Sequence, residues 1–294
     1  MRMKKYVLTA AVLAAVLAFS SCIDVKITSA EEPSSGQQSA ILGGNFQQSP
    51  EIVVTDPPAG GDSDTPSGGE QEDTPDTPRL PSEMSREQLL NYFNSSLNDV
   101  KISYPGFKRT KLTTVNDIKL SNSLANQFVS MFKSALLSED AEEKTASKGS
   151  SSEAIANMSP DTERYVSNLM ISDIENITLA TAGDNYVVTV YLPDAVNPGK
   201  DSGAYAKIFN FITVDDVEKT YAPKVGATVS RNNIEVKYSG CYAKAVISPD
   251  GKLQGYETYV TCVMNLKEAK ITDFIKTDVE ITLASDTQYT DFVH

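Results

Sequence analysis

Apolar residues that recur at helical spacing, directly after a helix start signal, mark the beginning of the folded part. Ser85-Arg86-Glu87-Gln88 has the form of a capping box, in which Ser85 caps the helix and Gln88 reaches back to it. Met84 and Leu89 flank the cap as a hydrophobic staple. The apolar stripe that follows comprises Leu89, Leu90, Phe93, Leu97 and Val100. The pattern predicts an amphipathic helix that begins at Ser85.

Three further helices are expected downstream. A second stripe with helical spacing comprises Leu124, Ala125, Phe128, Met131, Phe132, Ala135 and Leu136. A short helix is expected around 161–170, and a longer one over 203–221, with Thr213 capping its second part and Pro223 ending it. Residues 138–160 are rich in Ser, Glu, Lys and Gly, so we expect a mobile surface loop there.

Strand patterns dominate the rest of the chain. Thr and Val with partial alternation predict one or two strands over 107–120. The other expected strands are 174–182, 186–192, 229–239, 241–248, 252–266 and 270–284. Strands that follow one another through tight turns pair antiparallel. We therefore expect a single α+β domain over residues 85–294, with amphipathic helices packed on one face of an antiparallel, flat or curved sheet.

The turn at residues 248–252 decides the register of one hairpin. If Asp250 and Gly251 alone form the loop, two sensible cross-strand pairs result, Lys244–Glu257 and Tyr242–Tyr259. If Pro249, Asp250 and Gly251 form a three-residue loop with a bulge, every side chain changes face. The first register gathers apolar residues on one side and is the one that we favour.

Cys241 and Cys262 lie in the two strands of this hairpin. In the favoured register they share a face diagonally, at a separation near the upper limit for a disulfide. In the other register they point to opposite faces. Two interpretations stay open: a disulfide between Cys241 and Cys262, as secreted chains often form, or two buried free thiols.

The first 22 residues have the pattern of an export signal. Basic residues at positions 2, 4 and 5 precede an apolar run of about 14 residues, shorter than the roughly 20 that span a membrane. Ser20-Ser21-Cys22 follows, and this arrangement resembles the lipobox of bacterial lipoprotein precursors, although that family prefers Leu where this chain has Phe19. The resemblance implies that residues 1–21 are a cleaved signal peptide. The alternative is an ordinary secretory signal followed by an unrelated cysteine.

In that family the cysteine after the cleavage point receives lipid. The resemblance therefore implies that Cys22 carries the anchor, and that the protein is held on the extracytoplasmic face of the cell membrane. One acyl chain binds a membrane marginally and two bind it stably.

Residues 22–84 have the composition of a disordered stalk. Between residues 31 and 84 there are 11 acidic residues and one basic residue, which gives a net charge of −10 out of −13 for the chain. Eight of the 14 prolines also lie there. Such a segment has too little apolar surface to offset the entropy of ordering, and its prolines and like charges extend it. The acidic balance argues against nucleic acid as a partner, because nucleic-acid binding needs basic patches.

Patterns for catalysis and for metal binding are scarce. The one histidine, His294, is the last residue and is expected to fray, so neither a Ser-His-Asp triad nor a zinc cluster can be assembled in the domain. Glycine patterns for phosphate loops or dinucleotides are absent, and we expect no cofactor. Asp215-Asp216 and Glu257 could serve acid–base chemistry, but Asp215-Asp216 fits the first turn of a helix better.

One short motif matches a catalytic pattern. Ser130-Met131-Phe132-Lys133 has the S-x-x-K form of penicillin-binding proteins and serine β-lactamases. The companion K-T-G motif is only partly matched, by Lys276-Thr277-Asp278. We interpret the match as chance and expect a protein that is not an enzyme.

Two functions fit these observations. The first is a binding or interaction domain, with a contact surface formed by Tyr238, Tyr242, Tyr256 and Tyr259; the alternative for these tyrosines is packing between strands. The second is a carrier of lipid or another apolar ligand in a half-barrel pocket, because the order of elements is similar to that of the LolA and LppX groups of lipoproteins. An apolar cavity would favour the carrier, and a filled core with exposed tyrosines would favour the interaction domain.

Overall fold

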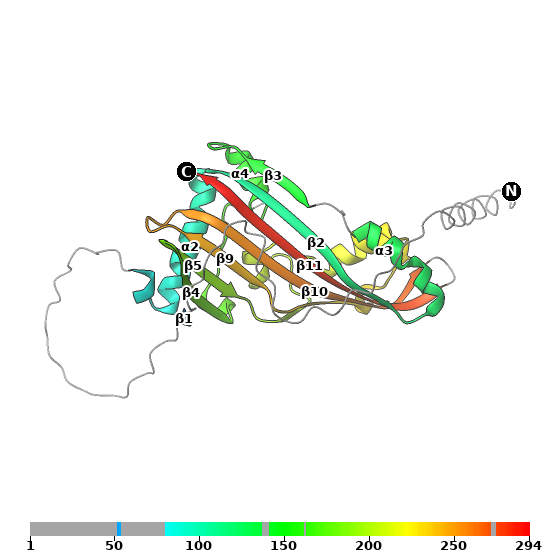
Figure 1. Cartoon of the computed structure of the whole chain (residues 1–294). Coiled ribbons are helices and arrows are strands. Elements are labelled where there is room, and N and C mark those ends of the chain that lie inside the picture. Colours follow the sequence, from blue (N-terminus) through cyan, green and yellow to red (C-terminus); the bar gives the residue numbers. More distant parts are fainter. Residues whose placement is uncertain (1–51, 54–79, 137–140, 162, 272–274) are drawn as a thin grey trace, which may run out of the picture. The chain divides into compact units, whose positions relative to one another are not determined.

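One antiparallel sheet organises the chain (Figure 1). The computed structural model describes residues 52–53, 80–136, 141–161, 163–271 and 275–294. The strands are β1 (Ile52–Val53), β2 (Gly106–Leu120), β3 (Glu142–Ala146), β4 (Asn176–Ala182), β5 (Asn185–Tyr191), β6 (Ala195–Val196), β7 (Ala227–Thr228), β8 (Ile234–Tyr238), β9 (Tyr242–Ile247), β10 (Leu253–Ile271) and β11 (Ile275–Val293). The signal segment, Cys22 and most of the acidic stretch lie outside the described residues.

Among the helices of the described residues, α2 is long and the others are short. The α-helices are α2 (Arg86–Ser103), α3 (Val129–Leu136), α4 (Ser151–Asn157), α5 (Val214–Asp216) and α6 (Ala222–Lys224), and a π turn, η6 (Val217–Tyr221), joins the last two. The 3₁₀ turns are η2 (Pro81–Glu83), η3 (Ser123–Phe128), η4 (Ile171–Asp173), η5 (Tyr205–Lys207) and η7 (Arg231–Asn233). The expected α+β fold is confirmed.

Three long strands form the middle of the sheet. The strand order is β1-β4-β5-β9-β10-β11-β2-β3, and every pair of neighbours is antiparallel. One side of β10 pairs with β11, and the other side pairs in turn with β9, β8 and β7. The order ends at β1 and β3 without closing into a barrel.

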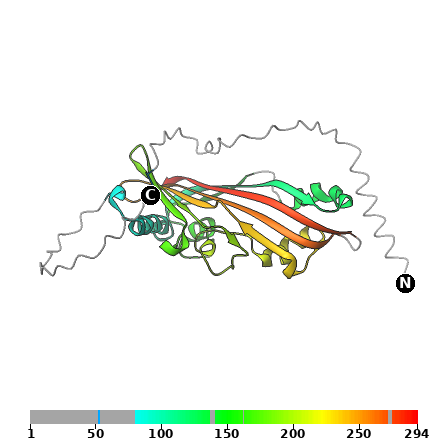
Figure 2. The ribbon, with the colours of Figure 1, turned by 90° about the horizontal axis from the view of Figure 1, so that it is seen from below.

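Helix α2 and the α5–α6 segment lie on one face of the sheet (Figure 2). The apolar stripe of α2 is fully buried there and belongs to the main core together with the inward side chains of the strands. The start signal works as expected, because the Ser85 hydroxyl accepts from the backbone N–H of Gln88 at 3.3 Å and the Gln88 side chain accepts from the backbone N–H of Ser85 at 3.0 Å. We call this the helix side of the sheet and the opposite side the open face.

The segment that follows the Ser159–Pro160 bond has turns and bends but no helix among its described residues, so the helix expected over 161–170 was wrong. Three side chains of α2 provide its hydrogen bonds. Asn98 accepts from the backbone N–H groups of Val166 and Ser167 at 2.8 and 3.0 Å. Asn94 donates to the Leu169 carbonyl at 2.8 Å, and Lys101 donates to three carbonyls between residues 160 and 165. These partners satisfy the backbone without a helix.

Other expectations need correction. Residues 138–160 were expected to form a loop, but β3 and α4 lie there, and β3 pairs with β2. Within 203–221, only the 3₁₀ turn η5 precedes Thr213. Thr213 caps α5 as expected, but the helical segment continues through Pro223 to Lys224. The acidic stretch contributes β1, whose two residues pair with β4.

The hairpin between β9 and β10 has the favoured register for an unexpected reason. Gly251 has φ +83° and its N–H bonds to the Ser248 carbonyl at 2.8 Å, while Ser248 also pairs with Lys252, so the loop has three residues. That loop alone would reverse the faces. A bulge between Leu253 and Gly255 restores them, and Lys244 lies opposite Glu257 as predicted.

Cys241 and Cys262 are both buried on the helix side and carry free thiols. The second of the two interpretations, two buried free thiols, describes them in the structure. Burial raises the pKa of the Cys241 thiol, and it raises that of Cys262 to about 12. Thiols held in this protonated state are poor nucleophiles.

Candidate functional site

Three clefts adjoin one another on the helix side, along the segment from Asn197 to Tyr221. Their volumes are about 570, 320 and 20 Å³. The first and second clefts share Lys200 and Asp201, and the second and third share Phe209 and Asn210. The clefts therefore form one row, which we call the cleft row.

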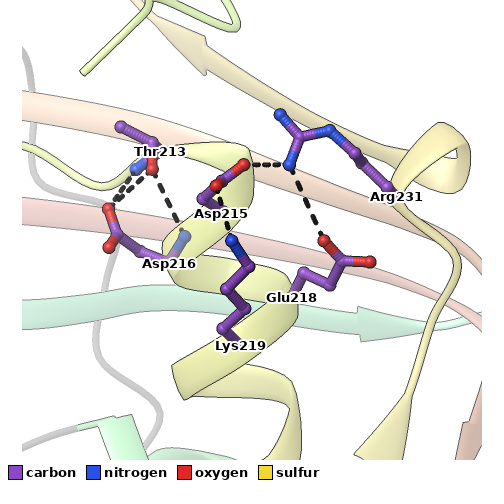
Figure 3. A network of polar contacts seen from close by, with 6 residues as sticks. All are labelled: Thr213, Asp215, Asp216, Glu218, Lys219 and Arg231. Carbon is purple, nitrogen blue, oxygen red and sulfur yellow. Dashed lines mark hydrogen bonds and ion pairs between the residues drawn. The ribbon is translucent and has the colours of Figure 1, made fainter. Parts of the chain in front are cut away.

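The first cleft lies between the loop at 197–201, the start of α5 and the turn η7. Its shape depends on the cap of α5 (Figure 3). Thr213 accepts from the N–H of Asp216 at 3.3 Å, and the Asp216 carboxylate accepts from the Thr213 N–H at 2.9 Å and hydroxyl at 2.7 Å. This reciprocal capping box fixes Thr213, Val214 and Asp215 at the wall of the cleft.

Ion pairs hold the opposite wall of the first cleft against α5 (Figure 3). Arg231 bonds Asp215 directly and lies 3.7 Å from a carboxylate oxygen of Glu218. Lys219 pairs with Asp215 from the other side at 2.8 Å. The hydrogen bonds from Lys219 and Arg231 lower the pKa of Asp215 to about 2, so this carboxylate is ionised at neutral pH. The cleft thus presents fixed charges of both signs.

The second cleft has an aromatic floor and polar edges. Phe209 and Phe211 line it together with Asn210, Asp216 and Glu163. The buried Tyr238 fixes this wall, since its hydroxyl donates to the Ile212 carbonyl at 2.5 Å and accepts from the Ile212 N–H at 2.9 Å. An apolar floor with a few polar groups is typical of a ligand site.

The third and smallest cleft lies where polar side chains occupy the helix side of the sheet. Arg109, Thr258 and Thr287 are buried there on three neighbouring strands, and Ser159 and Asn210 cover them. Sheet positions that face a core are usually apolar.

The four predicted contact tyrosines are divided between the two faces. Tyr238 and Tyr256 are 2% and 1% exposed on the helix side, so their assignment to a contact surface was wrong. Tyr242 and Tyr259 lie on the open face and are half-buried, with their rings stacked at 5.5 Å. Tyr242 donates to Glu257 at 2.5 Å, and Glu257 pairs with Lys244 at 2.6 Å. These contacts fit the alternative of packing between strands.

The remaining candidates lie apart from the cleft row. Ser130 and Lys133 are exposed on α3, and Lys276 pairs with Glu268 in the β10–β11 hairpin. His294 was expected to fray, but it is held in place. Its ring nitrogen Nε2 lies 2.6 Å from the Leu253 carbonyl, and its ring stacks on Phe292.

Sequence reasoning missed the lining of the cleft row, apart from Thr213, Asp215 and Asp216. A signal for Arg109 was present, because it has the same parity in β2 as the buried Phe107. Asn210 and Arg231 had no such signal, since loops that are distant in sequence bring them to the clefts.

No three His, Cys, Asp or Glu side chains of the described ranges gather as a metal site requires. No helix within those ranges combines the length and apolar character that crossing a membrane demands. Comparisons with protein-family models, curated proteins and solved structures give no match.

Proposed function

We propose that the domain binds a polar ligand of the size of a short peptide or oligosaccharide in the cleft row, without transforming it. The observation that carries this proposal is the adjacency of the three clefts, whose walls combine charges of both signs, amides, hydroxyls and aromatic rings. The first cleft alone, at about 570 Å³, is within the usual range of 300–1,000 Å³ for small-molecule sites.

The proposed setting is the extracytoplasmic face of a membrane. Lipid at Cys22 would anchor the chain, and the acidic, proline-rich stretch after it would hold the domain away from the bilayer. A binding domain in this position meets its ligand outside the cell. The support for this part is the sequence pattern around Cys22 together with the composition of residues 31–84.

An apolar carrier receives less support. The carrier needs a cavity lined by apolar side chains, whereas each cleft of the row is lined by several charged or polar ones. Inward side chains such as Ile177, Val188 and Met264 are buried in the core that α2 covers.

A screen of small polar ligands tests the proposed function. Saturation-transfer NMR would be run on the full chain with a library of di- and tripeptides and of mono- to trisaccharides. Val214→Trp fills the first cleft, and Ile102→Trp places the same side chain on the exposed side of α2, where Ile102 is 70% exposed. We expect to find ligands that bind the wild type and Ile102→Trp with equal affinity. Their affinity for Val214→Trp should be at least tenfold weaker. The absence of binders, or equal binding by Val214→Trp, would refute the proposal.

A further inference from the structure

Arg109 is the most unusual side chain of the cleft row. It lies on β2 and is only 4% exposed, yet its Nε and Nη1 nitrogens have no hydrogen-bond partner among the described residues. A guanidinium is charged at every physiological pH and carries five N–H donors. A buried charge without a partner costs several kcal/mol, so proteins rarely keep one unless something binds it.

The surroundings of Arg109 reinforce the need for an anion. Lys111 lies two residues along the same side of β2 and lines the same cavity. Burial and the nearby Arg109 charge lower the pKa of Lys111. The two carboxylates that act on Lys111 already have partners, Glu142 with Lys144 at 2.7 Å and Asp161 with the Asn210 amide at 2.6 Å. Two cations thus share one cavity without a dedicated counterion.

The other walls of the cavity also suit an anion. Thr258, Ser285 and Thr287 contribute hydroxyls from β10 and β11. A hydroxyl can donate to an anion, so these side chains add donors around the position that Arg109 faces. The Asn210 amide already donates to Ser159 at 3.1 Å and to Asp161. Asn210 is therefore engaged with other side chains and forms part of the cavity wall.

The size of the cavity limits what can enter. Its volume is about 20 Å³, and one water needs roughly 10–15 Å³ by the same kind of measure. A whole metabolite does not fit, so a ligand can place only a small terminal group in this cavity. Phe209 and Asn210 line both the cavity and the second cleft, so the rest of such a ligand would lie in the adjoining cleft.

We infer that the Arg109 cavity receives the carboxylate end of the ligand that the cleft row binds. This inference rests on the proposed function, because the cavity is the inner end of the same row. Arg pairs with carboxylates through charge-assisted hydrogen bonds, which are about twice as strong as neutral ones. The carboxylate supplies the acceptors that Arg109 lacks in the empty fold, and the negative charge neutralises part of the Arg109–Lys111 pair.

Formate, the smallest carboxylate, is the probe that separates this site from the rest of the row. Thermal unfolding of the full chain would be followed in increasing sodium formate and, at equal concentrations, in sodium chloride. We expect a saturable rise in Tm of about 2 °C in formate beyond that in chloride. Arg109→Met should lose the difference, and Lys119→Met, on the exposed side of the same strand, should keep it.

The Arg109 side chain also gives a direct signal that does not depend on a variant folding. In the wild type, the ¹⁵N Nε–H resonance of Arg109 should shift on titration with formate and reach a plateau. An unmoved resonance, equal effects of chloride and formate, or an unchanged formate effect in Arg109→Met would each overturn the carboxylate site. A formate response without any binder in the peptide and sugar screen would support the carboxylate site and refute the larger ligand.

Discussion

At the scale of single residues, Lys101 joins α2 to the irregular segment that begins at Pro160. Its ammonium group donates to the carbonyls of Pro160, Glu163 and Tyr165 at 2.6, 2.9 and 3.1 Å. Burial lowers the pKa of Lys101 to about 8, although Asp161 and Glu163 oppose the shift. The folded state therefore releases this proton at a lower pH than the unfolded chain does.

The sign of the pH effect follows from that difference. Between pH of about 8 and 10 the unfolded chain binds more protons at Lys101, so the free energy of unfolding increases with pH. Lys101→Met removes this titration and three hydrogen bonds, and we expect it to lower the free energy of unfolding by about 2 kcal/mol at neutral pH. Denaturant unfolding at several pH values should show the gap between wild type and variant widening as pH rises above 8. If the difference in the free energy of unfolding narrowed above pH 8, the lowered pKa of Lys101 would be contradicted.

Glu257 offers a second residue-scale prediction. It is 8% exposed, pairs with Lys244 at 2.6 Å and accepts from Tyr242. Glu257→Gln leaves Lys244 without its counterion in a mostly buried place, and we expect a loss of about 3 kcal/mol in the free energy of unfolding. The control is Glu235→Gln, which breaks the exposed pair with Lys237 and should change it by less than about 0.5 kcal/mol. Equal losses of stability in Glu257→Gln and Glu235→Gln would show that burial does not strengthen the Lys244–Glu257 pair.

At the scale of elements, the sequence predicts local structure correctly where a few neighbouring residues determine it. The capping boxes at Ser85 and Thr213 need only residues within three positions, and both form. The helix expected over 161–170 failed because its backbone partners are Asn94, Asn98 and Lys101, about 60 to 75 residues earlier in the chain. No local pattern contains that information.

The β9–β10 hairpin shows how two local details can cancel. The three-residue loop reverses the faces and the bulge after Leu253 restores them. Gly251 supports the loop with φ +83°, where other residues are strained. We expect Gly251→Ala to lower the free energy of unfolding by about 1 kcal/mol. In Gly255→Ala the added Cβ meets Val246 at an ordinary 3.6 Å, so that variant should cost less in the same denaturant titration. A larger cost at Gly255 would contradict this account of the loop.

At the scale of the whole molecule, the sequence predicted the fold class but not the cleft row. Periodicity reports which residues face a core, and it identified the stripe of α2 and most strands. The clefts arise where the loop at 197–201, the 205–213 segment and η7 meet, and such meetings depend on tertiary packing. Arg109 was not predicted either, although it shares its parity in β2 with Phe107 and alternation alone indicates a charge on the buried side of that strand.

The proposed anchor leads to a test on the intact chain. Expressed in a bacterial host with lipoprotein processing, the wild type should incorporate labelled palmitate and enter the detergent phase on partition. Cys22→Ser should lose both properties completely, because the proposed anchor is attached through the sulfur of Cys22. Cys262→Ser, which alters a buried thiol, is the control and should keep the label. Label that persists in Cys22→Ser would exclude Cys22 as the anchor.

The cleft row as the binding site is the central claim, and a chemical-shift map tests it most directly. Amide ¹H–¹⁵N spectra of the full chain would be recorded while the strongest binder from the peptide and sugar screen is added. The largest shifts should fall at Lys200, Asn210 and Val214, which line the three clefts. Shifts centred on Tyr242 and Tyr259 would instead place the ligand on the open face and contradict the account.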